Sequence, residues 1–194
     1  MDPRHSKCRK IYELLAEKNV PLIAHTGGEH TVQISRVELG DPNTLRPALD
    51  AGVTVIMAHC GTRSGLSDPN WMTDFFELAR KYPNCYGDTS AFCTQGRARW
   101  VPRFLREEGV MEKLVHGSDY PVPPMPFFFL RQIGLRNAWR FSKTWSFLER
   151  DVRIKRAAGI PDIVFENSAR VLTPGSLERW KIAAQPAGAS PKVP

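Results

Sequence analysis

Short apolar segments alternate with longer amphipathic segments along most of this chain, and this alternation limits its possible folds more than any other feature. The apolar segments have the length of buried strands, whereas the amphipathic segments have the length and the 3.6-residue periodicity of helices. Strands that alternate with helices pair in parallel, because each helix returns the chain to the edge of the sheet where the previous strand began. The sequence therefore predicts an α/β fold built on a parallel sheet.

The sequence divides into four expected strands, a set of expected helices and a tail. The strands are at 21–25, 53–59, 85–89 and 113–116. Helices are expected near residues 7–18, 43–51, 70–81, 97–107, 130–140, 146–157 and 161–170. The tail is composed mainly of Ala, Pro, Gly and Lys, which is typical of disordered termini. We therefore expect one domain over residues 1–173 and a disordered tail over 174–194.

Charge and cysteine usage exclude several classes of protein. The net charge of +7 is spread along the chain without a long basic run, so we expect no nucleic-acid partner, although a small acidic substrate would suit it. No apolar run approaches the roughly 20 residues that cross a bilayer, and we expect no membrane partner. The four cysteines form no C-x-x-C pair, and the charged start has no signal-peptide core. The expected location is the cytoplasm.

The informative polar residues stand at the ends of expected strands. His25 and His59 each end a strand, and Asp119 follows the last one. A loop with glycine or proline comes after each of them. The carboxyl ends of parallel strands meet at one edge of the sheet, so these side chains are expected to lie close together. A single histidine or Gly-Ser-Asp turn is often structural, but three such residues at strand ends favour an active site.

Imidazole and carboxylate groups are the ligands that a catalytic zinc ion uses, with one position left for water. The pattern therefore favours a divalent metal ion, zinc being the first choice, with a carboxylate such as that of Asp119 among its ligands. Asp119 is also expected to accept a proton from the metal-activated water. His59 is expected to be catalytic and to polarise the carbonyl under attack.

Five segments carry a family resemblance; in order they are PLIAHTG, VIMAHCG, NCYGDTSA, LVHGSDYPVP and FENSARVL. They resemble the later motifs of the amidohydrolase-related family, which contains metal-dependent hydrolases and decarboxylases on a TIM barrel. The resemblance runs from about Lys7 to Leu172. It implies the C-terminal half of a (β/α)₈ barrel, in which about four parallel strands correspond to the fifth to eighth.

The resemblance also implies roles for individual residues. His25 matches the metal ligand of strand five, and His59 matches the histidine of strand six, which binds a second metal or acts on the substrate. Asp119 matches the aspartate of strand eight, which contacts the metal and moves protons. Glu29 and His30 in the first loop, and Arg63 in the second, are expected to contact a small-molecule substrate, Arg63 through a carboxylate.

The chain departs from the family pattern, because no H-x-H pair occurs in it and strands one to four are absent. Two protein ligands hold zinc less well than three, so the chain alone is expected to bind metal weakly. Three explanations stay open: a fragment of a longer enzyme, one half of a split enzyme completed by another chain or by self-association, and a non-catalytic relic. An open half-barrel also has two exposed strand edges, which favours self-association.

The expected reaction is hydrolysis, with a metal-activated water attacking an amide, an ester, a lactone or a ring C–N or C–O bond. A decarboxylase of the same family, acting on an aromatic or unsaturated acid, is the enzymatic alternative. A metal-dependent deoxyribonuclease of the related barrel group suits the basic charge but fits the GSDYP and ENSARVL motifs less well. A non-catalytic half-barrel module is the alternative of another class.

Overall fold

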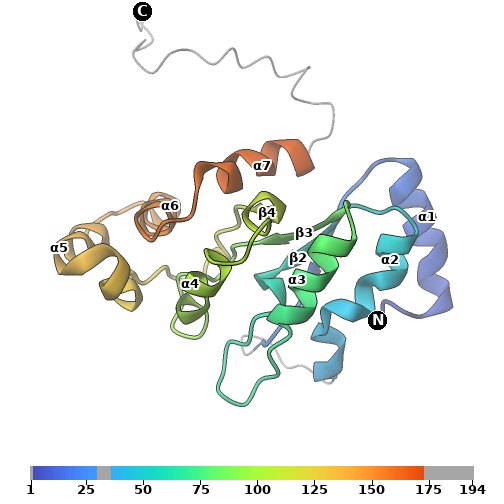
Figure 1. Cartoon of the computed structure of the whole chain (residues 1–194), viewed down its shortest axis with the longest axis horizontal. Helices are drawn as coiled ribbons and strands as arrows, with labels where there is room; N and C mark the ends of the chain where they lie inside the picture. The colour runs from blue at the N-terminus through green and yellow to red at the C-terminus, as the bar shows by residue number, and fades with distance from the viewer. Residues whose placement is uncertain (1, 30–35, 173–194) are drawn as a thin grey trace, which may run out of the picture.

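The computed structural model describes residues 2–29 and 36–172, and both His30 and the tail from 174 to 194 lie outside this described part. Its four strands form one parallel sheet in the order in which they occur in the sequence (Figure 1). They are β1 (Leu22–His25), β2 (Val55–Ala58), β3 (Cys85–Asp88) and β4 (Leu114–Val115). Each strand pairs with the next one, so β1 and β4 are the two edges. The expected α/β fold with four parallel strands is confirmed.

Seven α-helices accompany the sheet. They are α1 (Arg9–Glu17), α2 (Arg46–Asp50), α3 (Met72–Lys81), α4 (Val101–Phe104), α5 (Leu130–Ser142), α6 (Phe147–Ala157) and α7 (Asp162–Leu172). Two of them are shorter than the sequence predicts, because α2 and α4 each follow a 3₁₀ turn and have a proline in the first helical turn, Pro47 and Pro102. Proline has no N–H to donate, so it is favoured at a helix start and marks where the α-helix begins.

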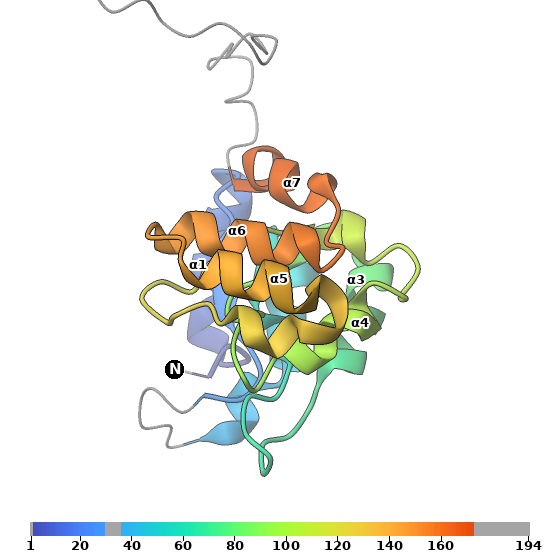
Figure 2. The ribbon, with the colours of Figure 1, turned by 90° about the vertical axis from the view of Figure 1, so that its left-hand side faces the viewer.

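The main core lies between the sheet and the helices around it. Phenylalanine rings fill its centre; Phe76 and Phe104 meet edge to face at 5.0 Å, and Phe92 lies 4.9 Å from Phe104. Figure 2 shows α5, α6 and α7 one above another, and buried residues of all three, such as Phe141, Ile154 and Val164, belong to the same core cluster. Asn167 of α7 donates to the carbonyl oxygen of Leu114 at 3.1 Å, which fixes α7 against β4.

The opposite face of the sheet is only partly covered. Ile56, Val115 and Val171 form a small cluster there, with Tyr86 packed against it. Ile23 of the edge strand β1 is 59% exposed on the same face, since it pairs in register with Ile56. Parallel sheets are normally buried on both faces, so this sheet is open where a closed fold would continue. No helix in the described part of the chain is long and apolar enough to cross a bilayer.

Candidate active site

A cavity of about 450 Å³ lies at the carboxyl ends of the strands, where the loops after β1, β2, β3 and β4 meet. It brings together three of the residues that the sequence singles out, namely Glu29, His59 and Asp119. His25 lies beside them, because its ring meets the ring of His59 edge to face at 5.0 Å. The cavity volume is within the range of small-molecule sites, about 300–1,000 Å³.

The backbone around this cavity has an unusual conformation. Five non-glycine residues of the described part have a positive φ, and four of them are in the loops that follow the strands: His59, Cys60, Ala91 and Asp119. Such conformations cost of order 1–3 kcal/mol each and persist where the surrounding contacts enforce them. Their concentration around one cavity indicates a functional site, and backbone strain of this kind was not predicted from the sequence.

Buried contacts with the end of β3 hold His59 in place. Its backbone N–H donates to Oδ1 of Asp88 at 3.0 Å. Its ring Nδ1 lies 3.1 Å from the carbonyl oxygen of Ser90 and 2.8 Å from the Ser90 hydroxyl oxygen. The Ser90 hydroxyl in turn donates to Asp88. A carbonyl oxygen only accepts, so Nδ1 carries the proton in the neutral ring and Nε2 offers a lone pair to the cavity.

Asp88 and Ser90 are therefore positioning residues that sequence reasoning missed. Both belong to the NCYGDTSA segment, and Asp88 is the last residue of β3. A polar residue at the end of a strand is the same signal that identifies His25 at the end of β1. The signal was missed for β3, because the expected strand ran to residue 89 and placed Asp88 inside the strand instead of at its end.

His25 ends the edge strand β1. Its Nδ1 lies 3.8 Å from Oε2 of Glu29, which is four residues further along the chain in the loop after β1. Partial burial lowers the pKa of His25, and the nearby His59 lowers it further, whereas Glu29 acts in the opposite direction. The imidazole is consequently neutral at pH 7, which is the form that binds a metal ion.

Asp119 is held through its neighbours in the loop after β4. Lys155 of α6 is completely buried; its Nζ donates to the carbonyl oxygen of Gly117 at 2.7 Å and to Oδ2 of Asp151 at 2.6 Å. His116 lies outside the cavity, with its Nε2 2.9 Å from the same Asp151 oxygen. A buried ion-paired group behind β4 thus fixes the backbone from which Asp119 reaches the cavity.

Two further residues were expected to contact the substrate, Arg63 and His30. Arg63 does not line the cavity; its guanidinium lies 5.4 Å from the centre of the Trp100 ring. Another arginine, Arg97, lines it instead, with its side chain almost fully buried. His30 falls outside the described residues.

The donor types around the cavity fit a divalent metal ion, but the side chains are not close enough together to form a metal site. Two imidazoles and two carboxylates lie around the cavity, yet no three His, Cys, Asp or Glu side chains of the described residues come close enough together to hold an ion. Cys60 does not supply the missing ligand, since burial raises the pKa of its thiol and the thiol donates to the carbonyl oxygen of Asp88 at 3.1 Å. A complete metal site would need these side chains to lie closer together or a further ligand to join them.

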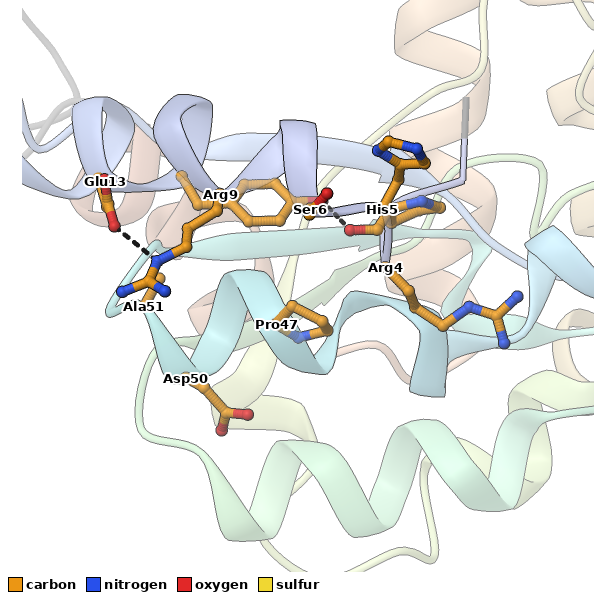
Figure 3. A pocket seen from close by; sticks show the side chains of 10 residues that line it. Arg4, His5, Ser6, Arg9, Glu13, Pro47, Asp50 and Ala51 are labelled. Atoms are coloured by element: carbon orange, nitrogen blue, oxygen red, sulfur yellow. Dashed lines mark hydrogen bonds and ion pairs between the residues drawn. The ribbon is translucent and has the colours of Figure 1, made fainter.

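A second cavity of about 430 Å³ lies on the outer side of the fold, between the start of α1 and α2 (Figure 3). Arginine side chains line it, but each is engaged locally: Arg4 pairs with Asp2 at 2.8 Å, and Arg9 pairs with Glu13 at 2.9 Å. These short-range pairs leave no buried group directed at a ligand, so the chemistry is concentrated in the first cavity.

Comparison with known families assigns the chain. A family model described as amidohydrolase matches residues 1–142. The chain therefore belongs to the amidohydrolase family, as the motifs within this range indicated.

A solved structure that is similar is an uncharacterised TIM-barrel protein from Bordetella bronchiseptica, at 18% identity and a TM-score of 0.49. The match covers 82% of this chain and 53% of that one, so the chain spans about half the length of that protein. Comparison with curated proteins finds no match.

Proposed function

We propose that this chain is part of a metal-dependent hydrolase that uses water to break an amide, ester, lactone or ring C–N or C–O bond. The observation that supports it most is the meeting of His59 and Asp119 in one cavity, with His25 in ring contact with His59. Each of the three comes from the carboxyl end of a different parallel strand, which is where barrel enzymes carry their active sites.

His25 and Asp119 would hold the metal, zinc being the first choice for this donor set. A third ligand would come from residues 30–35, from a further segment or from another chain. When bound, zinc supplies a water whose pKa is lowered to about 7, so that hydroxide is available at neutral pH. Asp119 and His59 would then transfer protons and stabilise charge at the bond that is broken.

The geometry of His59 refines its role. In the neutral ring Nε2 accepts a hydrogen bond, so His59 takes a proton from water or from the substrate before it can donate one. Polarisation of a carbonyl, as the sequence suggested, would require the doubly protonated ring. His59 can instead act as a general base, which takes up a proton at Nε2, and can then donate that proton to the leaving group.

A decarboxylase of the same family is the second candidate, and Arg97 favours it. A buried guanidinium beside the reactive residues suits a substrate that carries a carboxylate. We propose a cytoplasmic location for either enzyme, because the four cysteines are all free thiols in the described part of the chain.

Zinc titration of the metal-free chain by calorimetry tests the proposal. We expect weak zinc binding that His25→Gln and Asp119→Asn each reduce by more than the roughly 10- to 100-fold typical of an outer-shell change. His5→Gln, at an exposed histidine outside the cavity, is the matched control. Zinc-dependent turnover of nitrophenyl esters supports hydrolysis, and release of carbon dioxide from benzoic acids supports decarboxylation. Zinc binding that both site variants leave unchanged would refute the metal assignment and favour a non-catalytic module.

A further inference from the structure

Arg97 is the one lysine or arginine among the described residues that line the active-site cavity. It lies in the loop between β3 and α4, and 6% of its surface is exposed. The cavity wall that it forms also contains His59 and Asp119. A charged side chain in this position requires compensation, because an unpaired buried charge is costly.

The direct contacts of Arg97 are with neutral acceptors. Its Nη2 donates to the carbonyl oxygen of Gly28 at 2.5 Å, and its Nε donates to Oγ1 of Thr62 at 3.2 Å. None of the ion pairs within the described residues includes Arg97, and its Nη1 makes none of the hydrogen bonds found among them. The two acceptors lie in the loops after β1 and β2, and the two hydrogen bonds together fix the plane of the guanidinium.

Electrostatics leaves this cation incompletely compensated. Burial lowers the pKa of Arg97, and the carboxylates of Asp119, Glu29, Asp68 and Asp88 oppose the shift without cancelling it. An anion delivered to the cavity would supply the missing interaction.

We propose that Arg97 binds a carboxylate group of the substrate, so that the enzyme acts on a small carboxylic acid. The proposal rests on the function proposed above, since it places the ligand in the same cavity. The guanidinium is held in a fixed plane, which favours the directional recognition of a carboxylate over that of a diffuse anion. The cavity of about 450 Å³ sets the size of the acid at that of a small molecule.

The test compares two ligands of nearly the same shape, benzoate and benzamide, by calorimetry with the full chain. Both are measured without metal and again with zinc chloride, which separates binding at Arg97 from binding at the metal. We expect benzoate to bind at least about 10-fold more tightly than benzamide in both conditions, the size of a charge-assisted hydrogen bond. Arg97→Gln should remove this preference. Arg99→Gln should preserve it, because Arg99 is an exposed arginine of the same loop, with its Nε bonded to Gly96.

A second measurement requires no variant to fold. In the wild-type chain, the nitrogen-15 NMR signal of Arg97 Nε should shift on addition of benzoate and stay unchanged with benzamide. The proposal would be overturned by equal affinity for the two ligands, by an unchanged preference in Arg97→Gln, or by an Arg97 signal that does not shift on addition of benzoate. Arg97 would then have a structural role only, connecting the loops after β1 and β2. Because no turnover is measured, a chain without zinc-dependent activity can still bind benzoate through Arg97, and the two proposals fail separately.

Discussion

The Nδ1 atom of His59 lies 3.1 Å from the carbonyl oxygen of Ser90, a group that only accepts hydrogen bonds. The Ser90 hydroxyl, 2.8 Å from the same nitrogen, donates its own proton to Asp88 and therefore also accepts from His59. Both contacts favour the same tautomer. The proton position on His59 is consequently decided by the end of the neighbouring strand, through Asp88 and Ser90, which do not line the cavity.

Replacement of Ser90 by alanine tests this arrangement. Ser90→Ala keeps the carbonyl acceptor but removes the second acceptor and one donor to Asp88, so the fraction of His59 protonated at Nε2 should rise. Long-range nitrogen-15 NMR correlations of the imidazole report the tautomer directly. We also expect a stability loss of about 1 kcal/mol. Ser142→Ala, which removes an exposed hydroxyl bonded to Trp139, should alter neither the tautomer nor the site. A wild-type ring with its proton on Nε2 would contradict the assignment.

The loop after β1 should tolerate no side chain at Gly27. Its φ is +87°, and an added Cβ would lie 2.2 Å from the carbonyl oxygen of Thr62. Gly52 has a similar φ of +83° but no neighbour within 4 Å of an added Cβ, so it is a matched control. Gly52→Ala should lose about 1 kcal/mol from backbone strain alone. Gly27→Ala should lose clearly more in urea unfolding. Equal losses would show that the two loops do not approach as closely as described.

The sequence predicted the strands well, and it predicted that His25, His59 and Asp119 lie at the same edge of the sheet, because both depend on local patterns. Hydrophobic segments of strand length end at His25 and next to His59, and parallel pairing then brings those ends together. The lengths of α2 and α4 were overestimated, since a 3₁₀ turn followed by an α-helix has nearly the same apolar spacing as a single helix.

The parts of the site that escaped prediction depend on contacts distant in sequence. Arg97 is buried because it reaches Gly28 and Thr62, which are 69 and 35 residues away from it. The residues around Arg97 are those of an exposed, basic helix start, and the residues around Arg63 give no clearer indication of which arginine is buried. Only the packing of three loops decides which of these two arginines enters the cavity.

The buried ion pair behind β4 should be sensitive to loss of one partner. Lys155 and Asp151 are 0% and 1% exposed, and Nζ lies 2.6 Å from Oδ2. Lys155→Met leaves Asp151 with His116 as its remaining partner, and we expect a loss of about 3 kcal/mol. Arg153→Met on the same helix breaks the exposed pair with Glu149 and should cost less than about 1 kcal/mol. Similar losses in urea unfolding of the two variants would contradict this reading.

The lowered pKa of His25 predicts a pH dependence of stability in the metal-free chain. The unfolded chain takes up a proton near pH 6.5, whereas folded His25 does so at lower pH because of burial and of His59. Between these values the unfolded state binds more protons, so stability falls as pH drops below about 6.5 and levels off below the folded pKa. His25→Asn should flatten this part of a series of urea unfolding curves. His5→Asn is the control, and a slope retained in full by His25→Asn would exclude the site as its source.

The open face of the sheet should drive self-association of the chain. Ile23 is 59% exposed on the edge strand β1, whose outer backbone groups pair with no other strand among the described residues. An unpaired edge beside exposed apolar surface is a template for another strand. We therefore expect light scattering to show a molar mass that rises with concentration, and Ile23→Lys to reduce it, because a lysine on this face would have to be buried at the contact. Leu66→Lys places the same charge on an exposed loop and should have little effect. A monodisperse monomer at all concentrations would show that the open face is stable in water. If the chain is one half of a split enzyme, a different chain would then have to complete the barrel.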